Sequence, residues 1–120
     1  MLTEAEVQAA FVLYLVDRGW DVRTENADHA AVVATRGAEQ LVAEVKGTTE
    51  ATGTDVDTGY GQLLRRMLDA GTSYALVVPE RARAAALRVP APIRRRLDIT
   101  VFLVDDLGQV HRLGPDEPDA

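Results

Sequence analysis

The chain contains no cysteine, which excludes disulfide bonds and thiolate metal ligands. A metal ion would need oxygen or imidazole ligands, and the only imidazoles belong to His29 and His111. Aromatic residues make up 5% of the chain, too few for a platform on which single-stranded bases stack. Ser73 is the only serine, and no phosphate-binding glycine-rich motif occurs. These absences argue against serine-nucleophile enzymes and nucleotide-binding folds.

Long hydrophobic runs are also missing, since none approaches the roughly 18 residues that span a bilayer. The first residues, MLTEAEVQ, are acidic and helix-like rather than a signal peptide. With the lack of cysteine, this predicts a cytoplasmic protein with no membrane partner. The net charge of −6 argues mildly against a general nucleic-acid binder. Arginines cluster in the second half, but solvated helix faces explain most of them.

The remaining composition is that of an ordinary globular protein, with 47% hydrophobic and 27% charged residues among 120. This length predicts a single domain, which we place at residues 1–113. The last residues, 114–120, read GPDEPDA and combine three acids with two prolines. We expect this acidic tail to be disordered.

Hydrophobic periodicity predicts an α/β fold with the order α-β-β-β-α-β-α-β and a possible last edge strand. Thr3 and Glu6 form a capping-box pattern, and the first helix is expected to end at Gly19. A hairpin meander should precede a crossover unit, giving a central mixed sheet flanked by helices. The strands are expected at 20–26, 29–35, 40–47, 73–79, 99–106 and 109–113, the helices at 61–71, 80–89 and 91–97, and a polar loop at 48–59.

Two charged residues stand in an otherwise apolar strand, in the stretch VAEVKGTTE at 42–50. Glu44 and Lys46 share one strand face, whereas Val45 points to the other. A hairpin turn centred near Gly37 would pair position 28 near position 46, so Asp28 would add a second carboxylate. A solvent-exposed ion pair worth under about 1 kcal/mol is the alternative explanation for the two strand charges.

The favoured interpretation is a site for a hard cation, Mg²⁺ or Mn²⁺, because such ions prefer carboxylate and carbonyl oxygens. Asp28, Glu44 and the carbonyl of Val45 would bind the ion. The ion would stabilise charge on a reacting phosphate and activate a bound water. Lys46 would orient or deprotonate that water and neutralise the phosphate.

With Asp28 in ADHAAVVA, the Glu44-Val45-Lys46 triplet and an αβββαβ order over roughly residues 3–105, the chain resembles the PD-(D/E)XK nuclease superfamily. It looks most similar to small Holliday-junction-resolvase-like and Mrr-like members. The resemblance implies a restriction-endonuclease-like fold and a DNA substrate. Where the family usually has proline before the first acid, this chain has Ala27.

The resemblance also suggests further site residues. A glutamate near the start of the first helix joins the metal site in these nucleases; Glu6 is the best match and Glu4 the second. Many members carry a glutamine in the helix after the E-x-K strand, and Gln62 in GYGQLL matches it. The missing proline leaves Glu25 as an alternative to Asp28 for the first acid. Thr48, Thr49 and Tyr60 flank the site and could contact phosphate.

The sequence therefore predicts a magnesium-dependent endonuclease that hydrolyses DNA, working as a homodimer or with a partner protein. The strand at 99–106 and the arginine-rich helix before it are candidate surfaces for DNA or a second copy. The alternative is a catalytically inactive nuclease-fold module that binds nucleic acid or protein. Net negative charge favours this alternative, whereas the retained Asp28, Glu44 and Lys46 oppose it.

Overall fold

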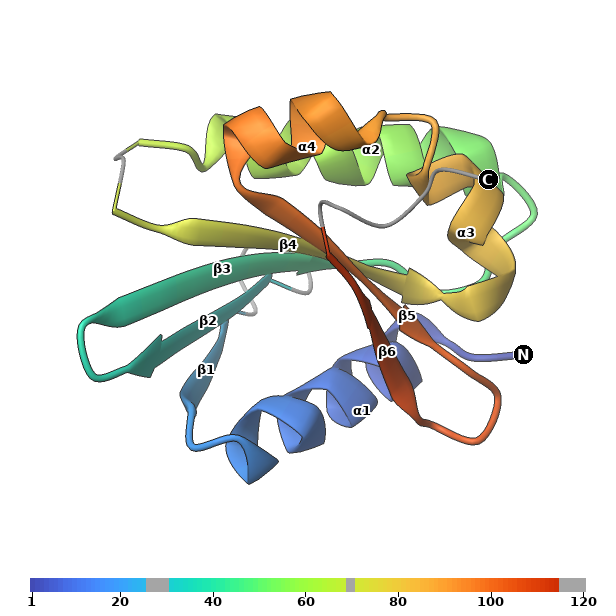
Figure 1. Cartoon of the computed structure of the whole chain (residues 1–120). Helices are drawn as coiled ribbons and strands as arrows, with labels where there is room; N and C mark the ends of the chain where they lie inside the picture. Colours follow the sequence, from blue (N-terminus) through green and yellow to red (C-terminus); the bar gives the residue numbers. More distant parts are fainter. Residues whose placement is uncertain (26–30, 69–70, 115–120) are drawn as a thin grey trace.

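The computed structural model describes residues 1–25, 31–68 and 71–114. Within them the protein is an α/β fold whose six-stranded mixed sheet is covered by helices on both faces (Figure 1). The elements follow the order α-β-β-β-α-β that the sequence predicts. The predicted fold class is therefore confirmed. The acidic tail lies beyond residue 114, outside the described residues apart from Gly114.

The six strands lie in the sheet in the order in which they occur in the chain. The first three form an antiparallel meander, the third to fifth are parallel, and the sixth returns antiparallel to the fifth. The carboxyl ends of the three parallel strands meet at one edge, where open α/β sheets commonly bind ligands. The bounds are β1 Asp21–Glu25, β2 Ala31–Arg36, β3 Glu39–Val45, β4 Ser73–Pro79, β5 Ile99–Val104 and β6 Val110–Leu113.

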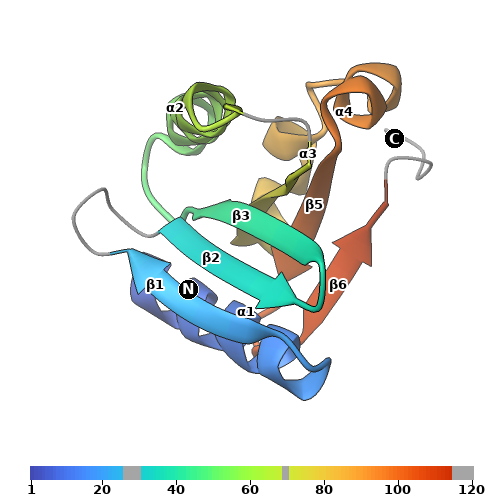
Figure 2. The same ribbon diagram turned by 90° about the vertical axis from the view of Figure 1, so that its left-hand side faces the viewer.

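One long helix, α1 (Glu4–Asp17), covers one face of the sheet (Figure 2). The predicted capping box starts it: the Glu6 amide donates to Thr3 Oγ1 at 3.1 Å, and the Thr3 amide donates to Glu6 Oε1 at 2.9 Å. Val7, Phe11 and Leu15 recur every four residues and are buried against the sheet. Gly19 follows the helix with a φ of +85°, which favours glycine.

The opposite face is covered by α2 (Thr52–Arg65), the 3₁₀ helix η1 (Glu80–Ala82), α3 (Arg83–Ala86) and α4 (Ala91–Leu97) (Figure 1). The predicted bounds of the loop at 48–59 and of the helix at 61–71 were wrong: α2 starts nine residues earlier and ends at Arg65. Glycine and threonine disfavour helix here, but burial against the sheet outweighs propensity. The helix buries Val56, Tyr60 and Leu63, whose spacing is helical.

The strand at 99–106 was proposed as a binding surface, and the structure contradicts this. β5 lies between β4 and β6, and its last four residues, 101–104, are all buried. Its apolar character serves the core rather than a partner. The preceding α4 is mixed: Arg94 is buried, whereas Arg95 and Arg96 are exposed.

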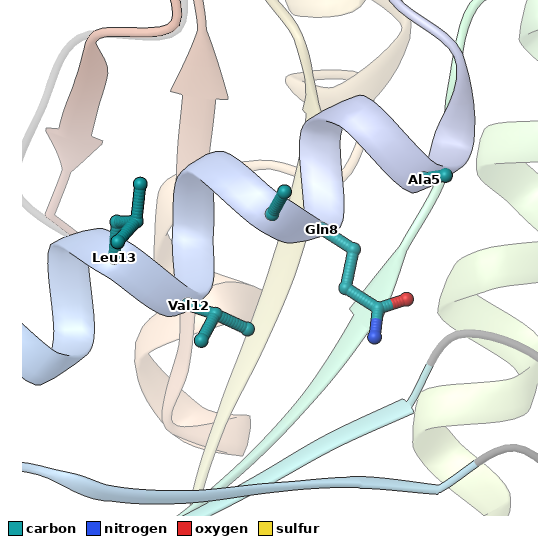
Figure 3. Close-up of a pocket in the computed structure, with 5 residues that line it drawn as sticks. Ala5, Gln8, Val12 and Leu13 are labelled. Atoms are coloured by element: carbon teal, nitrogen blue, oxygen red, sulfur yellow. The ribbon is translucent and has the colours of Figure 1, made fainter.

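The outer face of α1 is unusual because it is also apolar. Leu13 and Val16 are 65% and 52% exposed. Leu13 also lines an open hollow along the helix, together with Ala5, Gln8, Ala9 and Val12. Figure 3 shows these side chains. Among the described residues, no helix is long and apolar enough to cross a membrane.

Candidate functional site

Glu44 and Lys46 lie on the face of the sheet that α2 covers. Glu44, near the end of β3, contacts Arg66 at the C-cap of α2. Lys46 follows the strand, and its backbone amide donates to the Val77 carbonyl of β4 at 2.9 Å. Val45 between them is buried in the cluster beneath α1. The expected alternation is therefore confirmed, and the shared face is covered by a helix rather than open to solvent.

The Glu44 carboxylate is buried, with 1% of its side chain exposed. Arg66 donates from Nε to Glu44 Oε1 at 2.5 Å. The second oxygen, Oε2, is buried without a hydrogen-bond partner in the described parts of the chain. Buried carboxylate oxygens are normally paired, because an unpaired one forfeits its hydration. Among the residues that the structure describes, Oε2 is therefore a buried acceptor without a donor.

Burial and the neighbouring charges act in different directions on the pKa of Glu44. Burial is the largest effect and raises the pKa of Glu44 above its usual value. The hydrogen bond and charge of Arg66, and the charge of Lys46, lower it, whereas the charge of Glu4 raises it. The carboxylate is thus in contact with one cationic side chain and within electrostatic reach of a second one and of a second acid.

Lys46 packs its aliphatic stem against α2 at Gly59. A Cβ on Gly59 would lie 3.4 Å from Lys46 Cε and 3.0 Å from Leu76 Cδ1, so glycine leaves the room that the lysine occupies. The Lys46 ammonium forms no ion pair with any residue of the described segments. Within these segments its charge is not neutralised by an ion pair.

Gln62 lies on the same face of α2 as Gly59 and Arg66. It follows Gly59 by three residues and precedes Arg66 by four, and positions with these spacings are adjacent on a helix. Since Gly59 contacts Lys46 and Arg66 contacts Glu44, this face of α2 lies over the E-x-K segment. The Gln62 Oε1 atom is buried and accepts no hydrogen bond from the described residues.

The start of α1 packs against the end of β3. A Cβ on Gly47 would lie 2.2 Å from the Glu4 backbone nitrogen, a clash that only glycine avoids. The Thr48 amide also donates to the Leu2 carbonyl at 2.8 Å. This contact brings the first turn of α1 beside Lys46, as the prediction of a helix acid requires.

Of the two candidate helix acids, Glu4 is the one whose charge reaches Glu44. Glu6 is fully exposed and is held by Thr3, whose hydrogen bonds lower the pKa of Glu6. The capping role of Glu6, expected as one of its two functions, is confirmed. Its part in a metal site stays a prediction.

The first acid of the predicted site, Asp28, lies outside the described residues, as does His29. The described part of the hairpin starts at Ala31, which pairs with Glu44. Glu25, the alternative acid, ends β1 opposite Ala31. The predicted pairing between positions 28 and 46 therefore stays a prediction.

Sequence reasoning missed Arg66 as a site residue, because arginines in α2 were assigned to solvent. The signal was its spacing of four residues after Gln62. The sequence also singles out Lys46, which is the only lysine in a chain with twelve arginines.

The two threonines predicted to flank the site differ in their contacts. Thr48 has a buried Oγ1 without a partner in the described segments. Thr49 instead organises the start of α2, where it contacts Asp55 and accepts from the Ala51 amide at 3.2 Å.

A second group of polar side chains gathers at the ends of β4 and β5. Ligand atoms of Glu80, Asp105 and His111 lie within 4.8 Å of one another. Asp105 Oδ1 accepts from the amides of Leu107 and Gln109, each at 2.9 Å, and Oδ2 contacts His111 Nε2 at 3.0 Å. These contacts close the turn between β5 and β6, which gives the group a structural role.

No protein-family model matches the chain, and no curated protein matches it in sequence. Solved structures do share its fold. A XisH family protein from Nostoc punctiforme PCC 73102 has a TM-score of 0.64 at 15% identity, covering 91% of this chain and 99% of that one. An fdxN element excision controlling factor protein from Anabaena variabilis has a TM-score of 0.62 at 14% identity, covering 89% of this chain and 96% of that one. These similarities establish the fold.

Proposed function

We propose that this protein is a metal-dependent nuclease that hydrolyses DNA phosphodiester bonds at the site around Glu44 and Lys46. The observation that carries the proposal is the Glu44 carboxylate, buried to 1% exposure with Oε2 unpaired in the described residues. Burying such a group costs stability unless a ligand uses it. The name of the Anabaena variabilis protein with the same fold, an excision controlling factor, is compatible with a DNA substrate.

The residues present fit a divalent cation such as Mg²⁺ or Mn²⁺. Glu44 offers a free buried oxygen, Glu4 adds negative charge nearby, and the carbonyl of Val45 and the carboxylate of Asp28 are the further ligands that we propose. When bound, the ion would supply charge stabilisation and a more acidic water.

The side chains around the cation have separate roles in the proposed reaction. Lys46, which has no ion-pair partner in the described segments, would bind the scissile phosphate and orient the attacking water. Gln62 would use its unpaired Oε1 to accept a hydrogen bond from a water at the site. Arg66 fixes the carboxylate of Glu44 in place. A rigid arrangement of this kind lowers the barrier by holding the reacting groups in position.

An inactive binding module is the second candidate, and the ion pair between Glu44 and Arg66 favours it. Arg66 supplies a positive charge to the buried carboxylate without any metal. In that case the pair would be purely structural, and the site would neither bind a cation nor cut DNA. The two candidates differ in measurable ways.

Calorimetric titration with Mn²⁺ and Mg²⁺ tests the proposal, together with plasmid nicking on the same samples. We compare the wild type with the Asp28→Ala/Glu44→Ala double variant. A matched control is Asp17→Ala/Asp21→Ala, which removes two exposed acids, the last residue of α1 and the first of β1. Binding and nicking should be lost in the first variant and kept in the control. A wild type that binds no cation and cuts nothing would favour the inactive module.

A further inference from the structure

Among the described residues, the ion pair between Arg66 and Glu44 uses one of the two carboxylate oxygens and one of the three guanidinium nitrogens. An arginine that only neutralises a carboxylate tends to bind it with two parallel hydrogen bonds. Here a single contact joins Nε to Oε1 at 2.5 Å. Oε2 of the carboxylate is unpaired in the described residues, and Nη1 and Nη2 of the guanidinium donate to none of them.

The Arg66 side chain is partly open to solvent. The Arg66 side chain is 25% exposed, whereas Glu44 is 1% exposed, so the arginine extends from the buried carboxylate toward the solvent. Its backbone is fixed at the C-cap of α2, where its amide donates to Leu63 at 3.0 Å. Arg66 is therefore held at both ends of its stem, by its backbone amide and by the contact of Nε with Glu44.

The charges at the site favour an anionic ligand on this arginine. Arg66, at the C-cap of α2, contacts Glu44, and the charge of Lys46, just after β3, reaches it. Among the described residues, Glu4 and Glu44 balance Lys46 and Arg66, and with a divalent cation the sum of charges would be positive even if Asp28 adds a third carboxylate. Planar guanidinium donors match the geometry of phosphate oxygens.

We infer that Arg66 binds a phosphate of the DNA substrate through Nη1 and Nη2 while its Nε holds Glu44. This inference rests on the proposed function, since it assigns a substrate contact to the same site. Arg66 would then link the two halves of the site: the carboxylate for the cation and the donors for the phosphodiester. Lysine could not replace it, because an ammonium cannot bind both partners in fixed directions.

The experiment measures DNA binding in the Glu44→Gln background, since Arg66→Ala alone would leave a buried carboxylate without its counter-charge. Anisotropy of a labelled duplex is followed from 50 to 200 mM NaCl, without divalent cations. The variants are Glu44→Gln, Glu44→Gln/Arg66→Ala, Glu44→Gln/Arg66→Lys and Glu44→Gln/Arg65→Ala. Arg65 is the matched control: it is the neighbouring exposed residue of α2 and has the same charge. Circular dichroism checks that each variant is folded.

Loss of Arg66 should weaken binding about three- to tenfold and reduce the salt slope by about 0.9, the value for one phosphate contact. Arg66→Lys should recover the salt slope but not the full affinity, and Arg65→Ala should change affinity less than twofold. Equal losses for Arg65 and Arg66, or no loss for Arg66, would overturn the inference. Metal-dependent cutting by the wild type in that case would leave the proposed function intact, because the nicking assay is separate.

Discussion

Glu44 of β3 and Arg66 of α2 are joined by one contact of 2.5 Å, although their side chains could form two. The unpaired Oε2 atom of Glu44 is buried in the described core of the protein. A purely structural ion pair at this depth gains most when every polar atom is paired. The incomplete pairing therefore fits a carboxylate that binds a ligand. The side chains around Glu44 are the best targets for mutations that test this.

Lys46→Ala should abolish DNA cleavage while largely sparing metal binding. The lysine has a charge for the phosphate but no described ion-pair partner, so its removal takes away a substrate contact and leaves Glu44 in place. Plasmid nicking gives the cleavage rate and calorimetry the metal affinity. Equal cleavage by the wild type and the variant would remove Lys46 from the site.

Because Lys46 is the only lysine, amine-reactive labelling can report on it directly. Besides the chain's amino terminus, no other side chain carries a primary amine. If Lys46 binds phosphate, an excess of duplex DNA should slow its labelling severalfold and leave the amino terminus unaffected. Mass spectrometry of the digested protein measures both rates. Equal slowing at both amines would point to general shielding instead.

Mutations of the two acids in the first turn of α1, Glu4 and Glu6, should differ in their effect on metal binding. Glu4→Gln should weaken Mn²⁺ binding, because the charge of Glu4 reaches Glu44. Glu6→Gln should leave Mn²⁺ affinity nearly unchanged, and Glu6→Ala should lower the melting temperature through loss of the capping box. Calorimetry and thermal melting on all three variants test this. A larger loss of Mn²⁺ affinity in Glu6→Gln than in Glu4→Gln would instead assign the metal role to Glu6.

Glu44→Gln should stabilise the protein more at pH 8 than at pH 5. Burial raises the pKa of Glu44 in the folded state, so the native protein binds the proton more tightly than the unfolded chain. Stability from this group is present below the unfolded pKa and is lost as pH rises through the folded pKa. Glutamine carries no such proton and avoids the loss. Urea denaturation at both pH values measures the difference, and a difference independent of pH would contradict the assignment.

The fold and part of the site could be predicted from the sequence because both depend on local patterns. The alternation of Glu44, Val45 and Lys46 fixes which side chains share a strand face. The Thr3 and Glu6 pattern fixes the start of α1. Both are short-range features, and the structure confirms them.

Features that depend on tertiary contacts could not be predicted in this way. Helix α2 starts at Thr52 because burial of Val56 on the sheet outweighs poor local propensity. The contact between Arg66 and Glu44 joins residues 22 apart, and an arginine in a helix gives no local sign of its partner. In the sequence, Gly47 only marks the end of a strand. The need for glycine there follows from the start of α1, which packs against it.

Two glycines of α2 offer a matched test of how closely the position of Lys46 controls the reaction. A Cβ at Gly59 would lie 3.0 Å from Leu76 Cδ1, which must give by a few tenths of an ångström, and 3.4 Å from Lys46 Cε, where it would touch the lysine stem. A Cβ at Gly61 meets nothing within 4 Å. Both changes add a better helix former to the same helix.

Gly61→Ala should therefore stabilise the fold by about 0.5–1 kcal/mol and leave cleavage unchanged. Gly59→Ala should stay within about 1 kcal/mol of the wild type, because crowding offsets the gain in propensity. Its cleavage rate should nevertheless fall, by up to roughly tenfold, because the new methyl group would restrict the Lys46 stem beside the reacting phosphate, where small changes in position are costly. Urea denaturation and nicking kinetics provide both values. If the two variants cut DNA at the same rate, the close packing of Lys46 on Gly59 has no part in catalysis.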